Sequence, residues 1–437
     1  MKSIIHLLLL ACALGSLPLA PGCGGETEAP KENPAPEPML SNAYADAGPT
    51  KIRFVDISGT AGIDGINHSG RAGVKEFLIE AVGPGAAWLD FDADGLLDVY
   101  VPDGDIFDNY DLVQIAIGNA GRARTVLQAR AQRKEAFRDQ LYRNNGDGTF
   151  TDVAAQAGIL EEGWSFGSTA FDYDADGDTD IFVANFGPDV LWRNNGDGTF
   201  SDVAAEVGLQ GPAWSWSTCA AVGDVDGDGR LDIYVGAYAD PAAEAERLRV
   251  KQGRPAGSSV AAIGGRDCNW RGIKAYCGPR GLKGQYDTLY RQGEDGRFED
   301  MTDAWGVRPR VGKYAFTCLM FDFNEDGYQD IYVANDSEEN YMWQQERDDD
   351  GRIFFRDTAD TLGIKVGSQV TAQASMGADV ADIDGDGRLD IFVTNFSHDF
   401  NNMYMSKRVG GSGPVYFKDR GLQTMGQQVY YDLSWGC

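Results

Sequence analysis

A nine-residue acidic motif occurs five times along this chain of 437 residues. The copies span residues 90–98, 172–180, 224–232, 322–330 and 382–390. Every copy has an oxygen-bearing side chain at positions 1, 3 and 5, a glycine at position 6 and an aspartate at position 9. Side-chain oxygens at this spacing, together with the carbonyl of position 7, can surround Ca²⁺, and the glycine permits the sharp turn that is required. One copy would fit an ordinary solvated Asp-Gly turn, but five copies in register predict cation-binding loops.

Twenty side chains are the predicted metal ligands, four in each loop, and we expect about one Ca²⁺ per loop. They are Asp90, Asp92, Asp94, Asp98, Asp172, Asp174, Asp176, Asp180, Asp224, Asp226, Asp228, Asp232, Asp322, Asn324, Asp326, Asp330, Asp382, Asp384, Asp386 and Asp390. Nineteen of the twenty are aspartate, and the chain as a whole has a formal charge of −29. This charge argues against nucleic acid as a partner.

The residues after each loop exclude an EF-hand and predict a β-strand. An EF-hand needs a glutamate at position 12 and a helix on each side, whereas position 12 is valine in all five copies. The valines are Val101, Val183, Val235, Val333 and Val393. They lie in β-branched and aromatic runs, which are typical of buried strands. We therefore expect each loop to be a hairpin turn between two strands.

Two further modules follow each loop and complete a repeat. Residues 141–150, Leu-Tyr-Arg-Asn-Asn-Gly-Asp-Gly-Thr-Phe, recur at 191–200 and more loosely at 289–298, and their Asn-Gly and Asp-Gly steps predict a second hairpin. A Phe-x-Asp module that ends in glycine and an aliphatic residue recurs at 54–63, 150–159, 200–209, 298–307 and 355–364, with a weaker copy from Phe417. One repeat thus holds four strands, which we term A, B, C and D. Repeated four-stranded antiparallel units predict an all-β fold, a β-propeller.

This pattern resembles the FG-GAP and VCBS repeats of integrin-alpha-like propellers over roughly residues 52–437. More narrowly, it is similar to the bacterial relatives of cartilage acidic protein, which often carry a further C-terminal ASPIC/UnbV domain. The narrower likeness includes Cys268-x8-Cys277-Gly-Pro-Arg-Gly-Leu, followed by Tyr286-Asp and Leu289-Tyr-Arg. The resemblance implies calcium-stabilised adhesion or binding more than chemistry.

The order of the modules bears on the number of blades. The first module supplies a D strand at Phe54–Ile57 without A, B or C before it, and five complete sets follow. Residues 431–437 resemble the approach to another A strand. We therefore expect five complete blades plus an incomplete one, in a chain that is truncated or whose gene continues. The alternative is a five-blade ring with a loose tail.

The N-terminus predicts export. Lys2 precedes an apolar run that ends in Leu-Ala-Pro-Gly-Cys at 19–23, which resembles a bacterial lipoprotein cleavage site. We expect a signal peptide at 1–22, lipidation of Cys23, a disordered tether at 23–50 that is rich in Glu, Pro and Ala, and the propeller at 51–437. The protein would then be a membrane-anchored lipoprotein, periplasmic or at the cell surface. Simple secretion is the alternative.

Four of the remaining six cysteines form two groups. Cys268 and Cys277 lie in one loop-rich segment, and export favours a local disulfide between them. A zinc site is the alternative, although no histidine stands near in the sequence. Cys219 and Cys318 lie just before loops on A strands, where buried free thiols are expected and a bridge is possible.

Two connections between strands B and C are greatly expanded, at Pro102–Gln140 and Gly236–Gln285. Strand B leaves the metal loop, so both inserts should rise from the opposite face. Both are rich in basic residues: Arg130, Arg133, Lys134 and Arg138 near a predicted helix at Arg124–Arg138, and Arg247, Arg249, Lys251, Arg254, Arg266, Arg271, Lys274, Arg280 and Lys283. Long connections are often functional. We expect them to bind an extracellular protein or an anionic glycan, or merely to cover the propeller.

Catalysis has little support in the sequence. The mature chain would keep only His68 and His398, so a histidine triad or multi-histidine centre is hard to build. Both histidines should lie on the insert face. The alternative to a binding propeller is a polysaccharide lyase or hydrolase on the same scaffold, which the fold alone does not decide.

Overall fold

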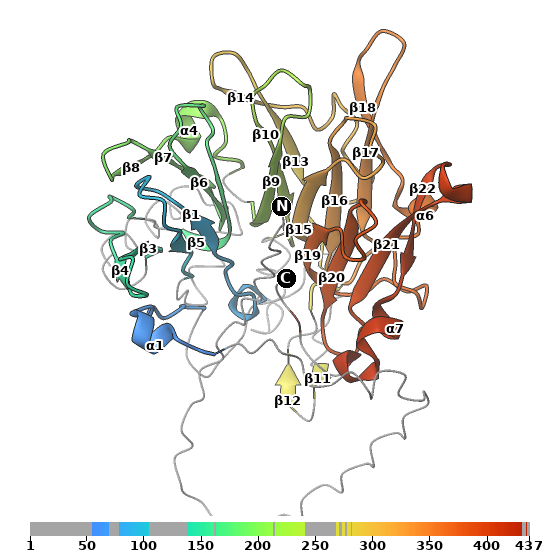
Figure 1. Ribbon diagram of the computed structural model, residues 1–437, viewed down its shortest axis with the longest axis horizontal. Coiled ribbons are helices and arrows are strands. Elements are labelled where there is room, and N and C mark those ends of the chain that lie inside the picture. Colours follow the sequence, from blue (N-terminus) through green and yellow to red (C-terminus); the bar gives the residue numbers. More distant parts are fainter. Residues whose placement is uncertain are drawn as a thin grey trace, which may run out of the picture.

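The structure is a computed structural model that describes residues 55–69, 78–104, 138–160, 163–212, 215–240, 268–270, 273–275, 278–280, 282–430 and 434. Five four-stranded antiparallel sheets dominate this part of the chain (Figure 1). We number them blades 1 to 5 in chain order. The predicted five four-stranded units and the all-β, propeller-like class are thereby confirmed.

Each blade follows the predicted A-B-C-D order. Blade 1 contains β1 (Ala87–Leu89), β2 (Asp98–Val101), β3 (Gln140–Asn144) and β4 (Phe150–Asp152). Blade 2 contains β5 (Trp164–Phe171), β6 (Asp180–Phe186), β7 (Val190–Asn194) and β8 (Phe200–Asp202). Blade 3 contains β9 (Ser217–Gly223), β10 (Asp232–Ala237), β13 (Thr288–Gln292) and β14 (Phe298–Asp300). Blade 4 contains β15 (Ala315–Phe321), β16 (Asp330–Asn335), β17 (Tyr341–Arg347) and β18 (Ile353–Asp357). Blade 5 contains β19 (Ser375–Ala381), β20 (Asp390–Asn395), β21 (Asn402–Arg408) and β22 (Val415–Asp419).

Short helices lie before blade 1, after blade 5, between some of the blades and, in one case, in the C–D connection of blade 5. The α-helices are α1 (Ser58–Ala61), α4 (Ala204–Val207), α6 (Ala359–Leu362) and α7 (Gly421–Met425), and the 3-10 helices are η1 (Ile79–Ala81), η2 (Val409–Gly411) and η3 (Gln427–Tyr430). The second insert also holds a two-stranded sheet of β11 (Cys268–Trp270) and β12 (Ile273–Ala275). In Figure 1 this sheet lies at the same end of the molecule as α1 and α7, opposite the tip of the β17–β18 hairpin. That position agrees with the predicted insert face.

Alternation along the strands explains how the blades pack. Strand A of each blade packs against strand A of the next, from β1 to β5, β9, β15 and β19. In β6, Ile181 and Val183 join the apolar cluster with blade 1, while Phe182 joins the cluster with blade 3. Successive side chains of a strand point to opposite faces. A strand B in a blade that has a neighbouring blade on each side is therefore apolar on both faces. The continuous run of apolar residues at 181–184 predicts this.

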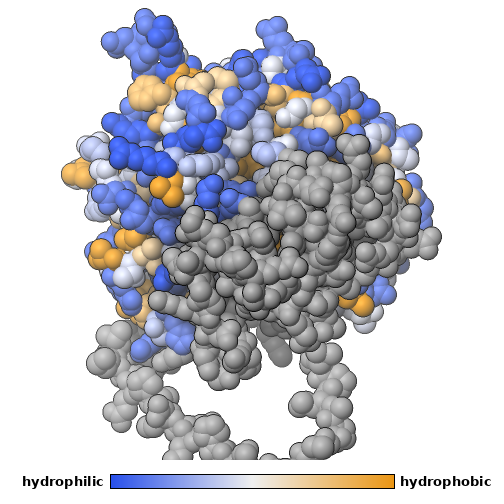
Figure 2. Space-filling model, turned by 180° about the vertical axis from the view of Figure 1, so that it is seen from behind, coloured by the Kyte–Doolittle hydropathy of each residue, from blue (hydrophilic) through white to orange (hydrophobic). Residues whose placement is uncertain are grey.

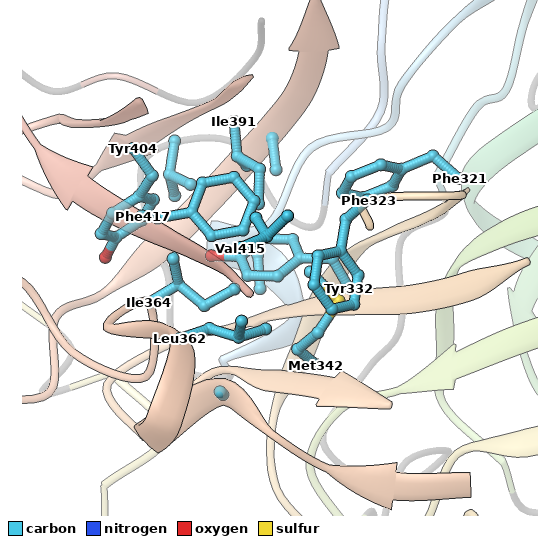
Figure 3. Packing of buried hydrophobic residues seen from close by; sticks show 14 residues of the cluster. Phe321, Phe323, Tyr332, Met342, Leu362, Ile364, Ile391, Tyr404, Val415 and Phe417 are labelled. Carbon is cyan, nitrogen blue, oxygen red and sulfur yellow. The ribbon is translucent and has the colours of Figure 1, made fainter. Parts of the chain in front are cut away.

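Apolar clusters fill each junction between successive blades. Figure 3 shows the one between blades 4 and 5, where Phe323 lies near Phe417 and where Tyr332, Ile391 and Tyr404 are fully buried. The rings of Phe323 and Phe417 have centroids 6.2 Å apart. Phe323 is position 2 of the fourth acidic loop, so the loop itself contributes to the core between the blades. Hydrophilic side chains cover most of the described outer surface in Figure 2.

The prediction of a strand at Phe54–Ile57 was wrong. Phe54 lies outside the described residues, and residues 55–57 are not in a strand. The Oδ1 atom of Asp56 accepts the backbone N–H and the hydroxyl of Ser58, at 2.9 and 2.6 Å, and α1 begins there instead. The module still stacks like its counterparts. A Cβ on Gly62 would meet the Phe150 carbonyl oxygen of blade 1 at 2.8 Å, just as one on Gly208 would meet the Phe298 oxygen at 2.9 Å.

Candidate functional site

The five acidic loops join strands A and B, as predicted, and share one scaffold of hydrogen bonds. The position 1 carboxylate accepts the backbone N–H groups of positions 5 and 6 in every loop, at 2.8–3.1 Å. The position 5 carboxylate accepts the N–H of position 7 in every loop, at 2.8–3.2 Å. The glycine at position 6 has a φ between 85° and 97°, which favours glycine. The turn is therefore determined by the motif itself.

The aspartate at position 9 is buried and has a second role. Asp180, for example, accepts the N–H of Tyr173 in its own loop at 2.9 Å and the N–H of Asn194 on strand C at 2.8 Å. The same two bonds recur in all five loops. Position 9 thus joins the loop to strand C. Each of its oxygens keeps a further lone pair, so ligation of a cation is still possible.

Burial raises the pKa of these position 9 carboxyls, because the charged form loses solvation. The pKa rises to about 6 for Asp98, to about 7 for Asp180 and Asp232, and to about 8 for Asp330, and that of Asp390 is also raised. Neighbouring loop carboxylates add to the effect by repulsion. The loops are therefore places where a bound cation would relieve an electrostatic cost.

Carboxylates gather closely in four of the loops. The groups are Asp90, Asp92 and Asp94; Asp172, Asp174 and Asp180; Asp224, Asp226 and Asp232; and Asp382, Asp384 and Asp390. The ligand oxygens of each group all lie within 4.8 Å of one another, so each group could hold a metal ion. In loop 4 the amide nitrogen of Asn324 donates to Asp326 at 2.8 Å, which brings these two predicted ligands together. The donor set of oxygens fits a hard cation such as Ca²⁺.

Among the described residues, basic side chains form ion pairs with the predicted ligand carboxylates of loops 3 and 5. In loop 3 the guanidinium of Arg291, on strand C, contacts Asp226 and lies 2.9 Å from Asp228. In loop 5 the ammonium of Lys407 lies 2.9 Å from Asp384. These contacts compensate part of the negative charge at positions 3 and 5. The five loops are thus not electrostatically equal, a difference that the aspartate motif alone does not show.

Sequence reasoning missed a set of amides that join the blades beneath the loops. They are Asn194 and Gln292, the last residues of β7 and β13, and Gln345 at the equivalent position in β17. The backbone N–H of each residue donates a hydrogen bond to the position 9 aspartate of its own blade. Their side-chain amides donate to the position 2 carbonyl of the preceding blade's loop. The accepting residues are Phe91 at 2.8 Å, Tyr173 at 2.8 Å and Val225 at 3.0 Å. The only sequence signal was an amide five residues after the Asp or Asn that precedes strand C.

A second missed repeat lies at the opposite face, at the start of strand C. Asp139, Asp189, Asp287, Asn340 and Asn401 each accept a backbone N–H from the end of strand B, at 2.6–2.9 Å. All five side chains are buried. The signal that could have found them is an Asp or Asn two residues before the Leu or Met of strand C. These residues close the B–C connection, including the two long inserts.

The two histidines lie at this opposite face, as predicted. His68 Nδ1 is 2.7 Å from Asp103 Oδ2, and its backbone N–H donates to Asp103 at 2.6 Å. Asp103 is buried at the end of strand B of blade 1, and burial raises its pKa. His398 belongs to blade 5, where its ring packs edge-on against Tyr430. Each histidine therefore contacts its own part of the fold.

Several predicted features lie outside the described residues. These are the signal peptide at 1–22, Cys23, the tether at 23–50, Cys277, the side chain of Cys268, and most of both inserts. Arg138 is described, and it is not helical as expected. Its guanidinium pairs with Asp152 of β4 at 2.6 Å, which assigns it to the scaffold of blade 1. None of the helices in the described part has the length and apolar character needed to cross a membrane.

The fold and the loops together define an all-β, propeller-like protein with acidic turns that could hold metal. The FG-GAP-like repeat family matches residues 129–183, 172–235 and 322–393, and the FG-GAP repeat family matches residues 220–253. The chain therefore contains FG-GAP repeats, which indicate a propeller of the binding or adhesion type and are typical of extracellular domains. The narrower resemblance to bacterial relatives of cartilage acidic protein stays a prediction. No curated protein sequence matches the chain significantly.

Solved structures with similar architecture include three of known origin or activity. One is an Agrocybe aegerita lectin that recognises non-reducing terminal N-acetylglucosamine, at 16% identity over 80% of this chain and 69% of that one, with a TM-score of 0.37. Another is the V. cholerae biofilm matrix protein Bap1, at 13% identity over 74% of this chain and 37% of that one, with a TM-score of 0.31. The exotype rhamnogalacturonan lyase YesX matches at 16% identity over 59% of this chain and 47% of that one, with a TM-score of 0.27.

Proposed function

We propose that this chain is a calcium-stabilised, extracytoplasmic binding propeller. The observation that carries the proposal is the recurrence of one loop scaffold five times, with carboxylate oxygens gathered in four of the loops. Positions 1, 3 and 5 and the carbonyl of position 7 would hold the ion, and position 9 would contribute while it joins the loop to strand C. Bound Ca²⁺ would supply positive charge to clustered carboxylates, and so stabilise the turns that position strands A and B.

The partner would bind on the insert face. The long B–C connections leave the blades at the end opposite the acidic loops, and the second one is basic, with nine Lys or Arg residues against four Asp or Glu, on a chain of charge −29. Basic segments on an acidic protein favour an anionic partner, because complementary potentials steer association. A surface glycan or an acidic extracellular protein meets this description. The lipid anchor at Cys23 would hold the propeller at a bacterial membrane, and it rests on the sequence pattern at 19–23.

The test compares two matched pairs of substitutions in the mature chain. One variant carries Arg247→Ser and Arg249→Ser in the second insert. The control carries Arg297→Ser and Arg352→Ser, two exposed residues in C–D turns at the loop face. Binding to immobilised anionic polysaccharide is measured in Ca²⁺ and in chelator. We expect the insert variant to lose binding several-fold and the control to keep it. Equal retention by both variants would place the partner elsewhere.

A carbohydrate-active enzyme is the second candidate, and one observation favours it. His68 is held by the buried carboxylate of Asp103, an arrangement that fixes the ring orientation of a general base. Incubation of the chain with anionic polysaccharides, followed by an assay for new reducing ends or unsaturated products, decides between the two. Turnover that His68→Ala abolishes would support the enzyme. Binding without product would support the binding propeller.

A further inference from the structure

The junction between blades 3 and 4 contains two cysteines that face each other. Cys219 lies on β9 and Cys318 on β15, the neighbouring A strands. Cys219 stands five residues before the first aspartate of its loop, and Cys318 stands four residues before the first aspartate of the next. Because side chains alternate along a strand, this offset of one turns the two side chains toward opposite faces of their strands. One thus points to the following blade and the other to the preceding blade.

The sulfur atoms are closer than non-bonded atoms normally stand. Cys219 Sγ and Cys318 Sγ are 3.0 Å apart, with both residues present as thiols. Carbon atoms in ordinary contact are about 3.5–4.0 Å apart, and sulfur is larger than carbon. Hydrogen bonds hold the two strands in this register, since the Thr218 hydroxyl lies 2.7 Å from the Ala315 carbonyl oxygen. The proximity is therefore built into the junction of the blades.

A glycine on strand B provides the space for the pair. A Cβ on Gly236 would stand 2.6 Å from Cys219 Sγ and 2.7 Å from Cys318 Sγ. The equivalent position, four residues after the last aspartate of the loop, is Pro102, Ala184, Ala334 or Thr394 in the other blades. Blade 3 alone among the five has no side chain there, and the two sulfurs occupy that volume.

We propose that Cys219 and Cys318 form a disulfide that links blade 3 to blade 4 in the exported protein. The two thiols lose two protons and two electrons, and the electrons reduce the active-site disulfide of a thiol–disulfide oxidoreductase to two thiols. The thiolate of Cys219 attacks that disulfide, and the thiolate of Cys318 then displaces the oxidoreductase. The reaction precedes complete folding, because Cys318 is buried in the folded chain and burial raises its pKa.

The bond would close a long loop that contains the rest of blade 3 and the second insert. Long loops gain most from such a link, since the unfolded chain loses more freedom. The link would hold the A strands of blades 3 and 4 together where the insert leaves β10. It is independent of Ca²⁺ and of the partner, so it stands apart from the proposed function.

Peptide mapping tests the proposal directly. The chain is exported into an oxidising compartment, and the cells are lysed in denaturant with an excess of alkylating agent. Trypsin then separates the relevant cysteines: Cys219 falls in peptide 194–230, Cys318 in 314–347, Cys268 in 267–271 and Cys277 in 275–280. We expect one species that joins 194–230 to 314–347 and that disappears on reduction. Recovery of both peptides as separate alkylated species would overturn the proposal. The peptides of Cys268 and Cys277 report their own predicted pairing in the same experiment.

A second measurement covers the consequence for stability. The denaturation midpoint of the wild-type chain should fall when a reductant is added. The midpoint of the double variant Cys219→Ala and Cys318→Ala should fall less on reduction than that of the wild type, and the reduced wild type and the reduced variant should have similar midpoints. A wild-type midpoint that reductant leaves unchanged would contradict the proposal.

Discussion

A single side-chain position at the start of strand C shows how this chain uses buried acids and amides for one task. Blades 1 to 3 have Asp139, Asp189 and Asp287 there, whereas blades 4 and 5 have Asn340 and Asn401. All five accept the same backbone N–H from strand B. An amide avoids the cost of a buried charge, and a carboxyl does not. The difference between the two groups should therefore appear in the pH dependence of stability.

Asp287→Asn should change that dependence. Burial raises the pKa of Asp287 to about 6, from an unfolded value of about 3.9. Between these two pKa values the folded chain holds a proton that the unfolded chain has lost. The stabilisation that results is fully present below pH ~4 and is lost as pH rises through ~6. Relative to wild type, Asp287→Asn should thus be more stable at pH 8 than at pH 4. Melting temperatures between these pH values provide the check.

The converse substitution is the control for this prediction. Asn340→Asp places a carboxyl at the matching position of blade 4, and its melting temperature should fall relative to wild type as pH rises from 4 to 8. Parallel pH profiles for wild type and both variants would show that the buried carboxyl does not titrate as argued.

Close approach between blades constrains Gly167 on β5. A Cβ there would collide with the carbonyl oxygen of Thr218 and would stand 3.1 Å from the Cα of Cys219, both backbone atoms of blade 3. Gly167→Ala should therefore destabilise the chain by about 1–3 kcal/mol, the usual cost of overpacking. Gly83→Ala is the matched control, since nothing lies within 4 Å of its added Cβ. Urea unfolding of both variants tests the prediction. Equal denaturation midpoints for Gly167→Ala and Gly83→Ala would contradict it.

At the scale of elements, the loop and the strands around it behave as one unit. The position 9 aspartate joins the loop to strand C by accepting a backbone N–H there, and the side-chain amide of that same residue donates to the loop of the previous blade. Three successive junctions, from blade 1 to blade 4, repeat this link. In blade 5 the residue at the position of these amides is Ser406, whose side chain is shorter than that of Asn or Gln. There Arg408 instead donates to the carbonyl of Asn324 in loop 4, at 3.0 Å.

Gln345→Ala tests this inter-blade link. The substitution leaves the buried carbonyl of Val225 without its amide donor, and an unsatisfied buried acceptor costs about 1–3 kcal/mol. We expect a lower denaturation midpoint in saturating Ca²⁺. Ser406→Ala removes a buried hydroxyl from the same position of blade 5 and should cost less. If Gln345→Ala unfolds at the same denaturant concentration as wild type, the amide link does not stabilise the junction.

The sequence predicted some elements well because their causes are local. The acidic motif determines its own turn through bonds between positions 1, 5, 6 and 7, so five loops could be placed from spacing alone. The strands after them were evident from their apolar runs. The side-chain amides of strand C and the facing pair Cys219–Cys318 depend on the packing of one blade against the next. Such contacts join residues about 100 positions apart, and periodicity does not reveal them.

At the scale of the whole molecule, charge and fold are linked through the loops. The chain has a formal charge of −29, and the predicted ligands account for nineteen aspartates. Clustered carboxylates repel one another and oppose folding until a cation compensates them. The basic side chains Arg291 and Lys407 already compensate loops 3 and 5 in part. Calcium should therefore stabilise the chain strongly, with loop 1 gaining more from the ion than loops 3 and 5.

The most direct test of this account is a Ca²⁺ titration of the metal-stripped mature chain, followed by heat of binding and by melting temperature together. Each site that binds only in the folded state should add about 2.7 kcal/mol at a hundredfold excess over Kd. We predict close to five equivalents of bound Ca²⁺ and a large rise in melting temperature. Absence of binding heat together with an unchanged melting temperature would contradict the account, and the five motifs would then be turns without an ion.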